Sequence, residues 1–268
     1  EFIICDDQST DGTGAILEKY QHKGLLRYYI NKSRLGFVGN FKRAVSLTSP
    51  TNYVALSDQD DIWLPGKLEA AADKMLETED GLRPAMVYSD LILVDQDKNL
   101  LNPSFRNELG QDVYVHCPET LLFGGFVNGC TMLMNPAMRN YFQTIPNHAK
   151  ESHDTWISLI AYTFGQAGIV PSSQILYRKH RDNASDLHDF SKKSRFGRLK
   201  AEVLWAFKKN DLFEDQISFV NDFYNTFHQE LNSDQKRLIL RFLKLKGRTY
   251  IEKKIALRMF FRGKWIKN

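Results

Sequence analysis

The chain has 268 residues, of which 43% are hydrophobic and 25% are charged, and its formal net charge is +4. This composition excludes a disordered or fibrous chain and is ordinary for a globular protein with a sizeable core. No apolar run reaches the roughly 18 residues of a membrane-spanning helix, and no secretory signal core is recognisable, so we expect a cytoplasmic protein. The three cysteines, Cys5, Cys117 and Cys130, fit buried reduced thiols better than a disulfide framework.

The first two thirds of the sequence alternate strand-like and helix-like segments. Apolar runs and alternation predict strands at residues 2–5, 26–30, 53–56, 86–94, 169–170 and 175–177. Polar turns, a proline and helical spacing predict helices at residues 13–21, 40–47, 65–77 and 154–164. Strands that alternate with helices predict an α/β domain with a mostly parallel sheet flanked by helices.

The character of the sequence changes after about residue 182. Residues 182–198 are polar and basic and predict a linker, and the residues beyond it have helical periodicity. One apolar stripe has spacings of four, three, four and three, and it consists of Phe213, Ile217, Val220, Tyr224 and Phe227. We therefore expect a main domain in residues 1–186 and a helical, basic extension in residues 187–268.

The end of the chain is strongly basic. Residues 236–268 hold twelve Lys or Arg residues and one acid, Glu252, so the rest of the chain carries a net negative charge. Aromatic residues, Tyr250 and Trp265 among them, lie between the basic ones. This combination indicates peripheral contact with an anionic surface, a membrane or a nucleic acid, and the alternative is a solvated helical face. The main domain lacks the interleaved basic and aromatic residues of single-strand binders, so nucleic acid is not expected.

Three aspartates follow the strand predicted at residues 53–56, within the run "SDQDD". In an extended segment alternate side chains share a face, which would place Asp58 and Asp60 together and Asp61 opposite. Two carboxylates at the carboxyl end of a parallel strand suit Mg²⁺ or Mn²⁺, whose other ligands are water and phosphates. The alternative is a charged, exposed turn in which Asp61 caps the next helix.

A second acidic pair, Asp6 and Asp7, also ends a predicted strand. The same edge of the sheet would then collect carboxylates from two places in the sequence. A carboxylate can accept a hydrogen bond from a base N–H or a ribose hydroxyl, which would make this loop a nucleoside-reading site. The glycines that follow match no phosphate-binding loop, so the metal would have to hold the phosphates.

Two further polar groups carry candidate functional residues. Asp154 opens a predicted helix, where the helix dipole favours the ionised carboxylate, and Trp156 lies two residues on. Together they suggest a general base beside a carbohydrate-stacking ring, although helix capping alone would also account for Asp154. Arg178 and His180 follow the last predicted strand. They are a candidate phosphate clamp and a candidate metal or phosphate ligand, and the alternative is a set of polar surface residues.

Several motifs in order resemble a known family. They are "ICDDQSTDGT", "ALSDQDDIW", "YSDLILVDQD", "FVNGCTMLMN", "HDTW" and "ILYRKHRDNAS". Together they resemble the family 2 glycosyltransferases of bacterial polysaccharide synthesis, close to the rhamnosyltransferase-like branch, and the resemblance covers about residues 1–186. It implies a GT-A-like α/β fold that binds nucleotide-diphospho-sugars, an acidic D-x-D motif for Mg²⁺ or Mn²⁺, and an inverting transfer.

The resemblance also implies roles for individual residues. Its nucleotide-sugar site takes in Asp6, which reads the nucleobase, with Asp7 beside it, Asp58 nearer the ribose, and Arg178. Its metal site takes in Asp60 and His180, with Asp61 as the alternative to Asp60. Its acceptor site takes in Asp154, which deprotonates the acceptor hydroxyl, with Trp156 on the acceptor side. The family pattern begins with a further strand and a nucleotide-contacting turn, and the sequence from Glu1 lacks both.

The implied reaction moves a sugar, rhamnose by the branch resemblance, from a dTDP- or UDP-sugar to a hydroxyl of a saccharide or lipid-linked saccharide acceptor. Such an enzyme would work at the inner face of the cell membrane during cell-surface polysaccharide synthesis. Two alternatives stay open. A nucleotidyltransferase that makes nucleotide sugars would ordinarily carry a glycine-rich phosphate loop with basic residues, and none is found. A catalytically inactive module that binds nucleotide or membrane is the other.

Overall fold

The computed structural model describes residues 1–108, 116–124, 127–146, 153–179 and 212–264. The strands are β1 (Ile3–Asp6), β2 (Arg27–Ile30), β3 (Val54–Ala55), β4 (Ile62–Trp63), β5 (Ala85–Ser89), β6 (Ile92–Val94), β7 (Leu100–Asn102), β8 (Leu133–Met134), β9 (Gln166–Val170) and β10 (Ile175–Arg178). The helices are α1 (Thr13–His22), α2 (Gly36–Ser46), α3 (Lys67–Thr78), α4 (Phe105–Glu108), α5 (Pro118–Leu121), α6 (Pro136–Tyr141), α7 (His153–Phe164), α9 (Glu214–Phe227), α10 (Ser233–Leu243) and α11 (Tyr250–Phe260), with short 3₁₀ turns η1 (Gly129–Thr131) and η2 (Phe142–Thr144).

The described strands form three sheets. β1 and β2 pair in parallel, a second sheet has the order β3-β8-β5-β9, and a third has the order β4-β10-β6-β7. The α/β fold with helices on both faces is confirmed. The sheets are mixed, however, and not mostly parallel: β8 runs antiparallel to both β3 and β5, and β4 runs antiparallel to β10. An apolar run in a sequence indicates that a strand is buried, but it does not indicate the direction of its neighbour.

The strand predicted at residues 86–94 is two strands that belong to different sheets. Asp90 lies at the break, where its carboxylate accepts hydrogen bonds from the backbone of Leu91 and from the Ser104 hydroxyl. β5 therefore ends at Ser89, and β6 starts a new sheet at Ile92. The sequence did not indicate this change of sheet, because β5 and β6 are both buried and together form one continuous apolar run.

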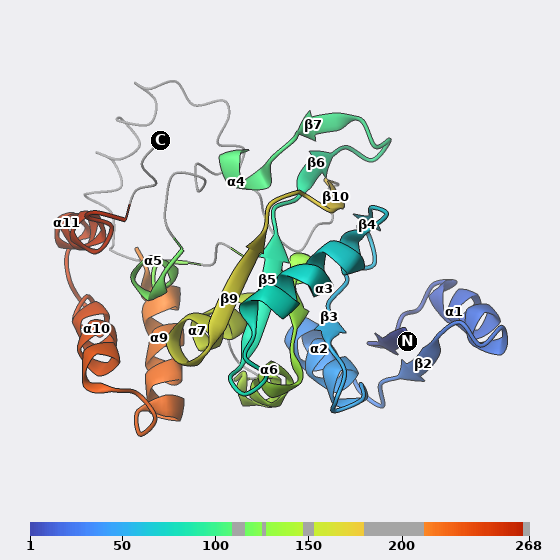
Figure 1. Cartoon of the computed structure of the whole chain (residues 1–268), viewed down its shortest axis with the longest axis horizontal. Coiled ribbons are helices and arrows are strands. Elements are labelled where there is room, and N and C mark those ends of the chain that lie inside the picture. The colour runs from blue at the N-terminus through green and yellow to red at the C-terminus, as the bar shows by residue number, and fades with distance from the viewer. Residues whose placement is uncertain (109–115, 125–126, 147–152, 180–211, 265–268) are drawn as a thin grey trace.

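The core lies on the two faces of β5, whose residues are all buried. Val87 points toward Met75 of α3, while Met86 and Tyr88 point toward α7, where Trp156 is fully buried. This alternation follows from the two-residue period of a strand. Figure 1 shows α3 and α7 on opposite sides of β5. The sheet is thereby fixed between two helices, and the loops at its end are held in place.

The C-terminal helices pack against the main domain and share its core. Phe219, Phe223 and Phe227 of α9 surround the Trp156 ring, with ring centroids 5.4, 5.4 and 5.9 Å away. The expected helical extension is thus confirmed. The stripe differs at its start, because Phe213 has φ of 64° and precedes the helix. The predicted linker and the boundary at residue 186 lie outside the described residues.

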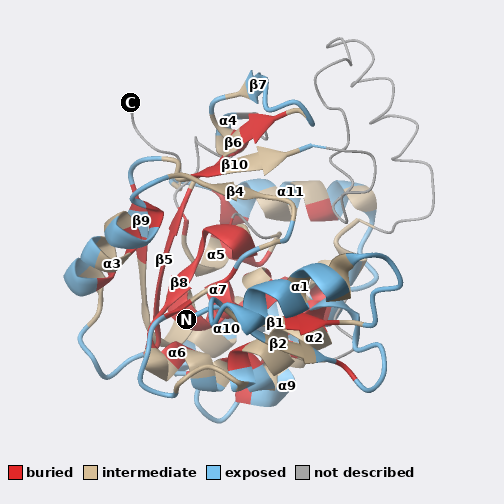
Figure 2. Cartoon of the chain, turned by 90° about the vertical axis from the view of Figure 1, so that its right-hand side faces the viewer, coloured by how far each residue is buried: buried red, intermediate tan, exposed pale blue. Residues whose placement is uncertain are grey.

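The first strand–helix–strand unit contrasts with this packed end. α1 has no buried residue, and Figure 1 places α1, β1 and β2 beside the rest of the molecule. Figure 2 shows the exposed surface of α1 directly. Apolar side chains such as Phe2 and Leu25 are exposed here. Among the helices in the described ranges, none is both long and apolar enough to cross a bilayer.

Candidate active site

A tight turn after β3 brings two aspartates together. The chain is not extended here but turns at Gln59 and Asp60, so the side chains of Asp58 and Asp61 converge. With the thiol of Cys130 they form a group whose nearest ligand atoms all lie within 4.8 Å of one another. The extended-strand prediction, which paired Asp58 with Asp60, therefore does not describe this cluster, because a turn replaces the two-residue period by an i, i+3 relation.

Strand register explains why Cys130 is part of the cluster. β3 pairs antiparallel with β8, with Ala55 opposite Leu133. η1 immediately precedes β8, so this pairing brings Cys130 to the end of β3 from which Asp58 follows. The sequence pattern predicted a purely structural role for Cys130. The motif "FVNGCTMLMN" drew attention to this segment. The sequence did not indicate that Cys130 lies near Asp58, because that depends on the pairing of β3 with β8.

The cluster is electrostatically strained. Burial raises the pKa of Asp58 to about 6, and the neighbouring charges of Asp61 and Asp60 act in the same direction. Burial likewise raises the pKa of Asp61. The pKa of the Cys130 thiol lies well above its usual value because the group is buried beside Asp61 and Asp58. Two half-buried carboxylates that repel each other would be stabilised by a cation between them.

The oxygens of Asp61 have unused bonding capacity. Both are buried, and neither accepts a well-formed hydrogen bond from the described residues. Burial raises its pKa, and the nearby Cys130 thiol and Arg178 oppose that shift. Carboxylate oxygens of this kind fit Mg²⁺ or Mn²⁺, which prefer oxygen ligands, whereas a protonated thiol is a poor ligand for either ion. The donor set of Asp58 and Asp61 therefore fits the divalent cation that the sequence suggested.

A lysine that the sequence motifs do not single out lies beside this cluster. Lys67 begins α3 after Gly66, whose φ of 84° turns the chain into the helix. Its side chain is buried, and its ammonium nitrogen lies 3.8 Å from the centroid of the Trp63 ring. Burial lowers the pKa of Lys67 to about 8, and nearby Cys130 opposes the shift. No helical spacing could have indicated this contact, because Trp63 ends β4 and Lys67 begins α3.

Arg178 supports the acidic turn from the neighbouring strand. β10 pairs antiparallel with β4, so Arg178 lies opposite Asp60, and its Nε donates a hydrogen bond to the Asp60 carbonyl oxygen. The contact of Arg178 with phosphate stays a prediction. His180, the predicted second metal ligand, lies outside the described residues.

Asp154 reaches the same cluster from α7. Its Oδ2 accepts a hydrogen bond of 3.1 Å from the Gly129 backbone, and its Oδ1 accepts one of 2.7 Å from the Thr155 backbone. Its charge is among those that raise the pKa of Cys130, which follows Gly129 in the chain. Three separate segments thus meet here: the turn with Asp58 and Asp61, η1 with Cys130, and the start of α7 with Asp154.

The ring of His153 fixes the backbone that holds Asp154. It is buried in contact with Phe41 and Phe142, and neither ring nitrogen makes a hydrogen bond to a described residue. Burial lowers its pKa to about 4. A Cβ at Gly129 would lie 2.6 Å from its Nε2, so only glycine fits against this ring without a shift.

Trp156 does not face the site. It is fully buried, its Nε1 donates a hydrogen bond of 3.0 Å to the Thr144 hydroxyl, and its ring packs among the phenylalanines of α9. This burial contradicts the acceptor-side role predicted for Trp156. Two residues along a helix correspond to a rotation of about 200°, so Trp156 points away from the side that Asp154 occupies.

The other acidic pair is satisfied by the protein itself. Asp6 accepts hydrogen bonds of 2.8 Å from the Ser9 backbone and 2.9 Å from the Tyr28 hydroxyl. Asp7 accepts bonds from the Asn31 side chain and from the Leu35 and Gly36 backbones at the start of α2. Burial acts to raise the pKa of each carboxyl group, but these hydrogen bonds outweigh it, and both pKa values are lowered. The cluster of candidate metal ligands in the described residues contains neither.

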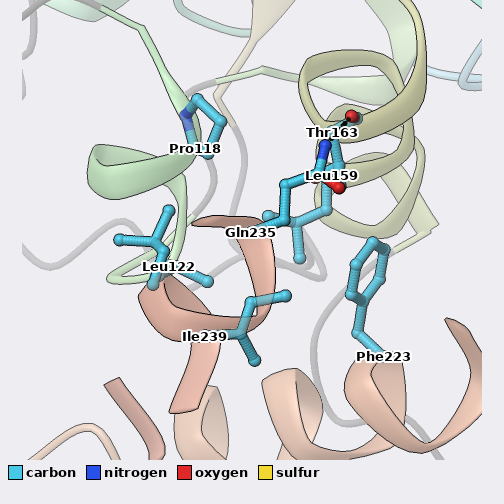
Figure 3. A pocket seen from close by; sticks show the side chains of 8 residues that line it. Pro118, Leu122, Leu159, Thr163, Phe223, Gln235 and Ile239 are labelled. Carbon is cyan, nitrogen blue, oxygen red and sulfur yellow. Dashed lines mark hydrogen bonds between the residues drawn. The ribbon is translucent and has the colours of Figure 1, made fainter. Parts of the chain in front are cut away.

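A small apolar pocket lies elsewhere, between α5, α7, α9 and α10. Figure 3 shows its lining, which includes Leu122, Leu159, Phe223 and Ile239, and the hydrogen bond of 2.6 Å from the Gln235 side chain to the Thr163 carbonyl. None of the clustered carboxylates contributes to it. We interpret it as a gap in the packing between the helices and not as a part of the site.

Comparison with known proteins gives consistent matches. Residues 1–116 match the family described as Glycosyl transferase family 2. The chain is 28% identical over 176 residues to the putative teichuronic acid biosynthesis glycosyltransferase TuaG of Bacillus subtilis, covering 63% of this chain and 64% of TuaG. It is 26% identical over 239 residues to the dTDP-rhamnosyl transferase RfbG of Shigella flexneri, covering 82% of this chain and 78% of RfbG. The chain thus spans slightly less than two thirds of the length of TuaG.

Solved structures show the fold. The crystal structure of S. aureus TarS 1-349 in complex with UDP has a TM-score of 0.52 and 15% identity, with 98% of this chain and 78% of that chain covered. The complex of the same protein with UDP-GlcNAc has a TM-score of 0.51, with 91% and 70% covered. At this identity the likeness shows the fold alone. It confirms the GT-A-like α/β fold that the sequence predicted.

Proposed function

We propose, from the match of residues 1–116 to Glycosyl transferase family 2, that the chain transfers a sugar from a nucleotide-diphospho-sugar to an acceptor hydroxyl with inversion at the anomeric carbon. The observation that carries the proposal is the cluster of Asp58, Asp61 and Cys130, with Asp154 hydrogen-bonded to Gly129, the residue before Cys130. Asp58 and Asp61 have the properties of cation ligands, and the carboxylate of Asp154 is held in place by backbone hydrogen bonds. A sugar-nucleotide transfer requires both functions.

Asp58 and Asp61 are the residues that would hold a divalent cation, with Asp61 in the position first assigned to Asp60. Their raised pKa values and the unused oxygens of Asp61 support this assignment. When bound, Mg²⁺ or Mn²⁺ supplies Lewis-acid stabilisation of the negative charge that develops on the departing diphosphate. The hydrogen bond from Arg178 to the Asp60 carbonyl oxygen stabilises the turn. The turn in turn fixes the spacing of the Asp58 and Asp61 carboxylates.

Asp154 is the proposed general base. It would take the proton of the acceptor hydroxyl as the acceptor oxygen attacks the anomeric carbon and the nucleoside diphosphate leaves from the opposite face. Such proton transfer contributes on the order of 10²- to 10⁴-fold. The hydrogen bonds from Gly129 and Thr155 hold the carboxylate in place and favour its ionised form. A base that is fixed by backbone donors loses little entropy when the acceptor binds.

The donor and the acceptor are inferred from relatives. RfbG is named as a dTDP-rhamnosyl transferase and TarS has been solved with UDP and UDP-GlcNAc, which supports a dTDP- or UDP-sugar as donor, rhamnose included. TuaG is named for teichuronic acid biosynthesis, which supports a saccharide or lipid-linked saccharide of the cell envelope as acceptor. Asp6 remains the proposed contact to the nucleobase, with Asp7 shaping the loop behind it.

A panel of nucleotide sugars tests the proposal. The full chain is incubated with Mn²⁺, each dTDP- or UDP-sugar and a lipid-linked saccharide acceptor, and the release of nucleoside diphosphate is measured. We expect release with one donor and stimulation by the acceptor. Pyrophosphate release from a nucleoside triphosphate and a sugar phosphate would identify a nucleotidyltransferase instead. Donor binding without release under all conditions would identify an inactive binding module, and either result contradicts the proposal.

A further inference from the structure

The outward face of α11 carries an exposed apolar stripe. Ile251, Ile255 and Met259 are 62%, 53% and 57% exposed and lie at spacings of four residues, so they occupy one side of the helix. Figure 2 shows exposed and buried residues along the same helix. Single exposed apolar residues are ordinary on a protein surface. Three that align along one helix present a continuous apolar strip to solvent.

Basic residues extend this strip. Arg258 lies next to Met259 in α11, Arg262 lies two residues past the end of the helix, and both are exposed. The only acid among residues 236–268 is Glu252, and its carboxylate is paired with Arg248 at 3.1 Å. The face is therefore apolar along its centre and basic beside it, with no uncompensated negative charge from this segment.

The opposite face of α11 is locked onto the protein. Lys253 is fully buried and its ammonium lies 2.5 Å from the Glu214 carboxylate at the start of α9. The ring of Phe260 lies 5.1 Å from Phe123, and the Arg241 guanidinium lies 4.5 Å from the Phe260 centroid. A helix anchored by a buried ion pair cannot rotate to bury its stripe in the core. The stripe is consequently presented outward in a fixed orientation.

We propose that α11 is a docking helix that lies flat in the interface of an anionic lipid membrane and orients the catalytic domain on it. Charge complementarity identifies the occupant, because the exposed Arg258 and Arg262 accompany the stripe and the one acid of residues 236–268, Glu252, is paired with Arg248, so this face favours a negatively charged surface. A nucleic acid would satisfy the charges but offers no apolar layer to the stripe, whereas a lipid interface satisfies both. A helix of 11 residues is about 16 Å long, so it lies in the interface and does not span it.

The proposal goes beyond the transfer reaction and can be tested without it. The full chain is mixed with vesicles of phosphatidylcholine alone or of phosphatidylcholine and phosphatidylglycerol in equal parts, with no donor present, and the bound fraction is measured by co-sedimentation. We expect binding to be at least about tenfold tighter on the anionic vesicles and to weaken as salt is added.

Two variants separate the contributions of the stripe and the charges. Changing Ile251, Ile255 and Met259 together to Gln removes the apolar strip, and R258Q with R262Q removes the adjacent charges. All five side chains are exposed, so the fold should be kept, and circular dichroism checks this. We expect each variant to bind the anionic vesicles at least about fivefold more weakly, and only the charge variant to reduce the salt dependence.

Matched controls use exposed residues far along the chain. The pair L76Q and L82Q removes exposed apolar residues from the body, and K19Q with K32Q removes exposed charges there. These controls should bind vesicles as the unchanged chain does. The proposal is overturned if the stripe variant binds as tightly as the controls. It is also overturned if a short DNA duplex binds the chain more tightly than anionic vesicles do, with the same affinity in the stripe variant.

Discussion

Two pairs of carboxylates follow strands in this protein, and their surroundings differ. Asp6 and Asp7, after β1, accept well-formed hydrogen bonds from their own loop and from α2, and their pKa values are lowered. Asp58 and Asp61, after β3, lie close together in a buried turn, and their pKa values are raised. The first pair stabilises the fold as it stands. Burial and mutual repulsion make the charged form of the second pair unfavourable without a counter-charge, which is the property expected of the cation site proposed here.

The largest predicted effect concerns Asp154, the proposed general base. Asp154→Asn keeps the size of the side chain and its backbone contacts but removes the basic oxygen. We expect the turnover rate to fall by about 10²- to 10⁴-fold, while binding of donor and Mn²⁺, measured by calorimetry, stays within about twofold. Turnover that survives this change would show that another group takes the proton.

The next prediction distinguishes the role of Asp61 in metal binding from that of Asp60. Asp61→Asn should lower turnover by about 10²- to 10³-fold and weaken Mn²⁺ binding, because it removes the charge of a proposed carboxylate ligand. The matched control is Asp60→Asn, which removes one charge from the same turn but lies outside the cluster. We expect the control to have a much smaller effect. Loss of Mn²⁺ binding in Asp60→Asn with normal binding in Asp61→Asn would reverse the assignment of the two residues.

His153 extends the comparison to a buried base whose ring nitrogens make no hydrogen bond to a described residue. Its pKa is about 4 in the folded protein and about 6.5 when unfolded, so between these values the unfolded chain binds more protons. Its contribution to stability is complete above pH 6.5 and declines as the pH falls toward 4. From about pH 7.5 to about pH 5 we expect this group to remove about 2 kcal/mol of unfolding free energy.

Urea unfolding of the unchanged chain and of His153→Leu at both pH values isolates this contribution. Other groups titrate in the same range, Asp58 with the opposite sign, but they are common to both proteins. The variant should therefore lose less stability on acidification than the unchanged chain. Equal losses would mean that the ring is not held in its neutral form by burial.

The smallest effect compares the two acidic pairs directly. Asp7→Asn weakens two hydrogen bonds at the start of α2 and one from the Asn31 side chain, and should lower the unfolding free energy by about 1 kcal/mol. Asp58→Asn, measured without metal, should leave stability unchanged or raise it, since it removes a repelling charge. Denaturant titrations of both variants provide the measurement. If Asp58→Asn were destabilised and Asp7→Asn were as stable as the unchanged chain, the proposed difference between the two pairs would be wrong.

Much of the architecture could be predicted from local pattern. The strands at residues 2–5 and 26–30, the helices at residues 65–77 and 154–164, and the basic helical end all appear within a few residues of their predicted places. These elements depend on periodicity and capping, which are properties of neighbouring residues. Strand boundaries were predicted less well where one apolar run contains two strands, as on either side of Asp90. Both strands are buried, so the hydrophobic pattern does not change at the break.

The geometry of the candidate site was predicted in part. Asp58 and Asp154 were singled out from charge and position, but the alternation rule placed Asp58 beside Asp60, whereas the chain turns at Gln59 and Asp60 and brings Asp58 next to Asp61. Lys67 and Cys130 were missed because neither lies next to the acids in the sequence. Trp156 was assigned to the acceptor side from proximity to Asp154, although helix geometry directs the two side chains apart.

The sequence by itself determined the kind of protein: an α/β domain with acidic residues at strand ends, a family 2 glycosyltransferase pattern and a basic helical end. The tertiary structure decided which of those acids act together. The antiparallel pairing of β3 with β8 set Cys130 against Asp58, the pairing of β4 with β10 set Arg178 against the turn, and the anchoring of α11 turned a basic segment into an oriented face. The physical reason is that charge and periodicity are local, whereas the environment that shifts a pKa or exposes a stripe is built by residues far apart in the chain.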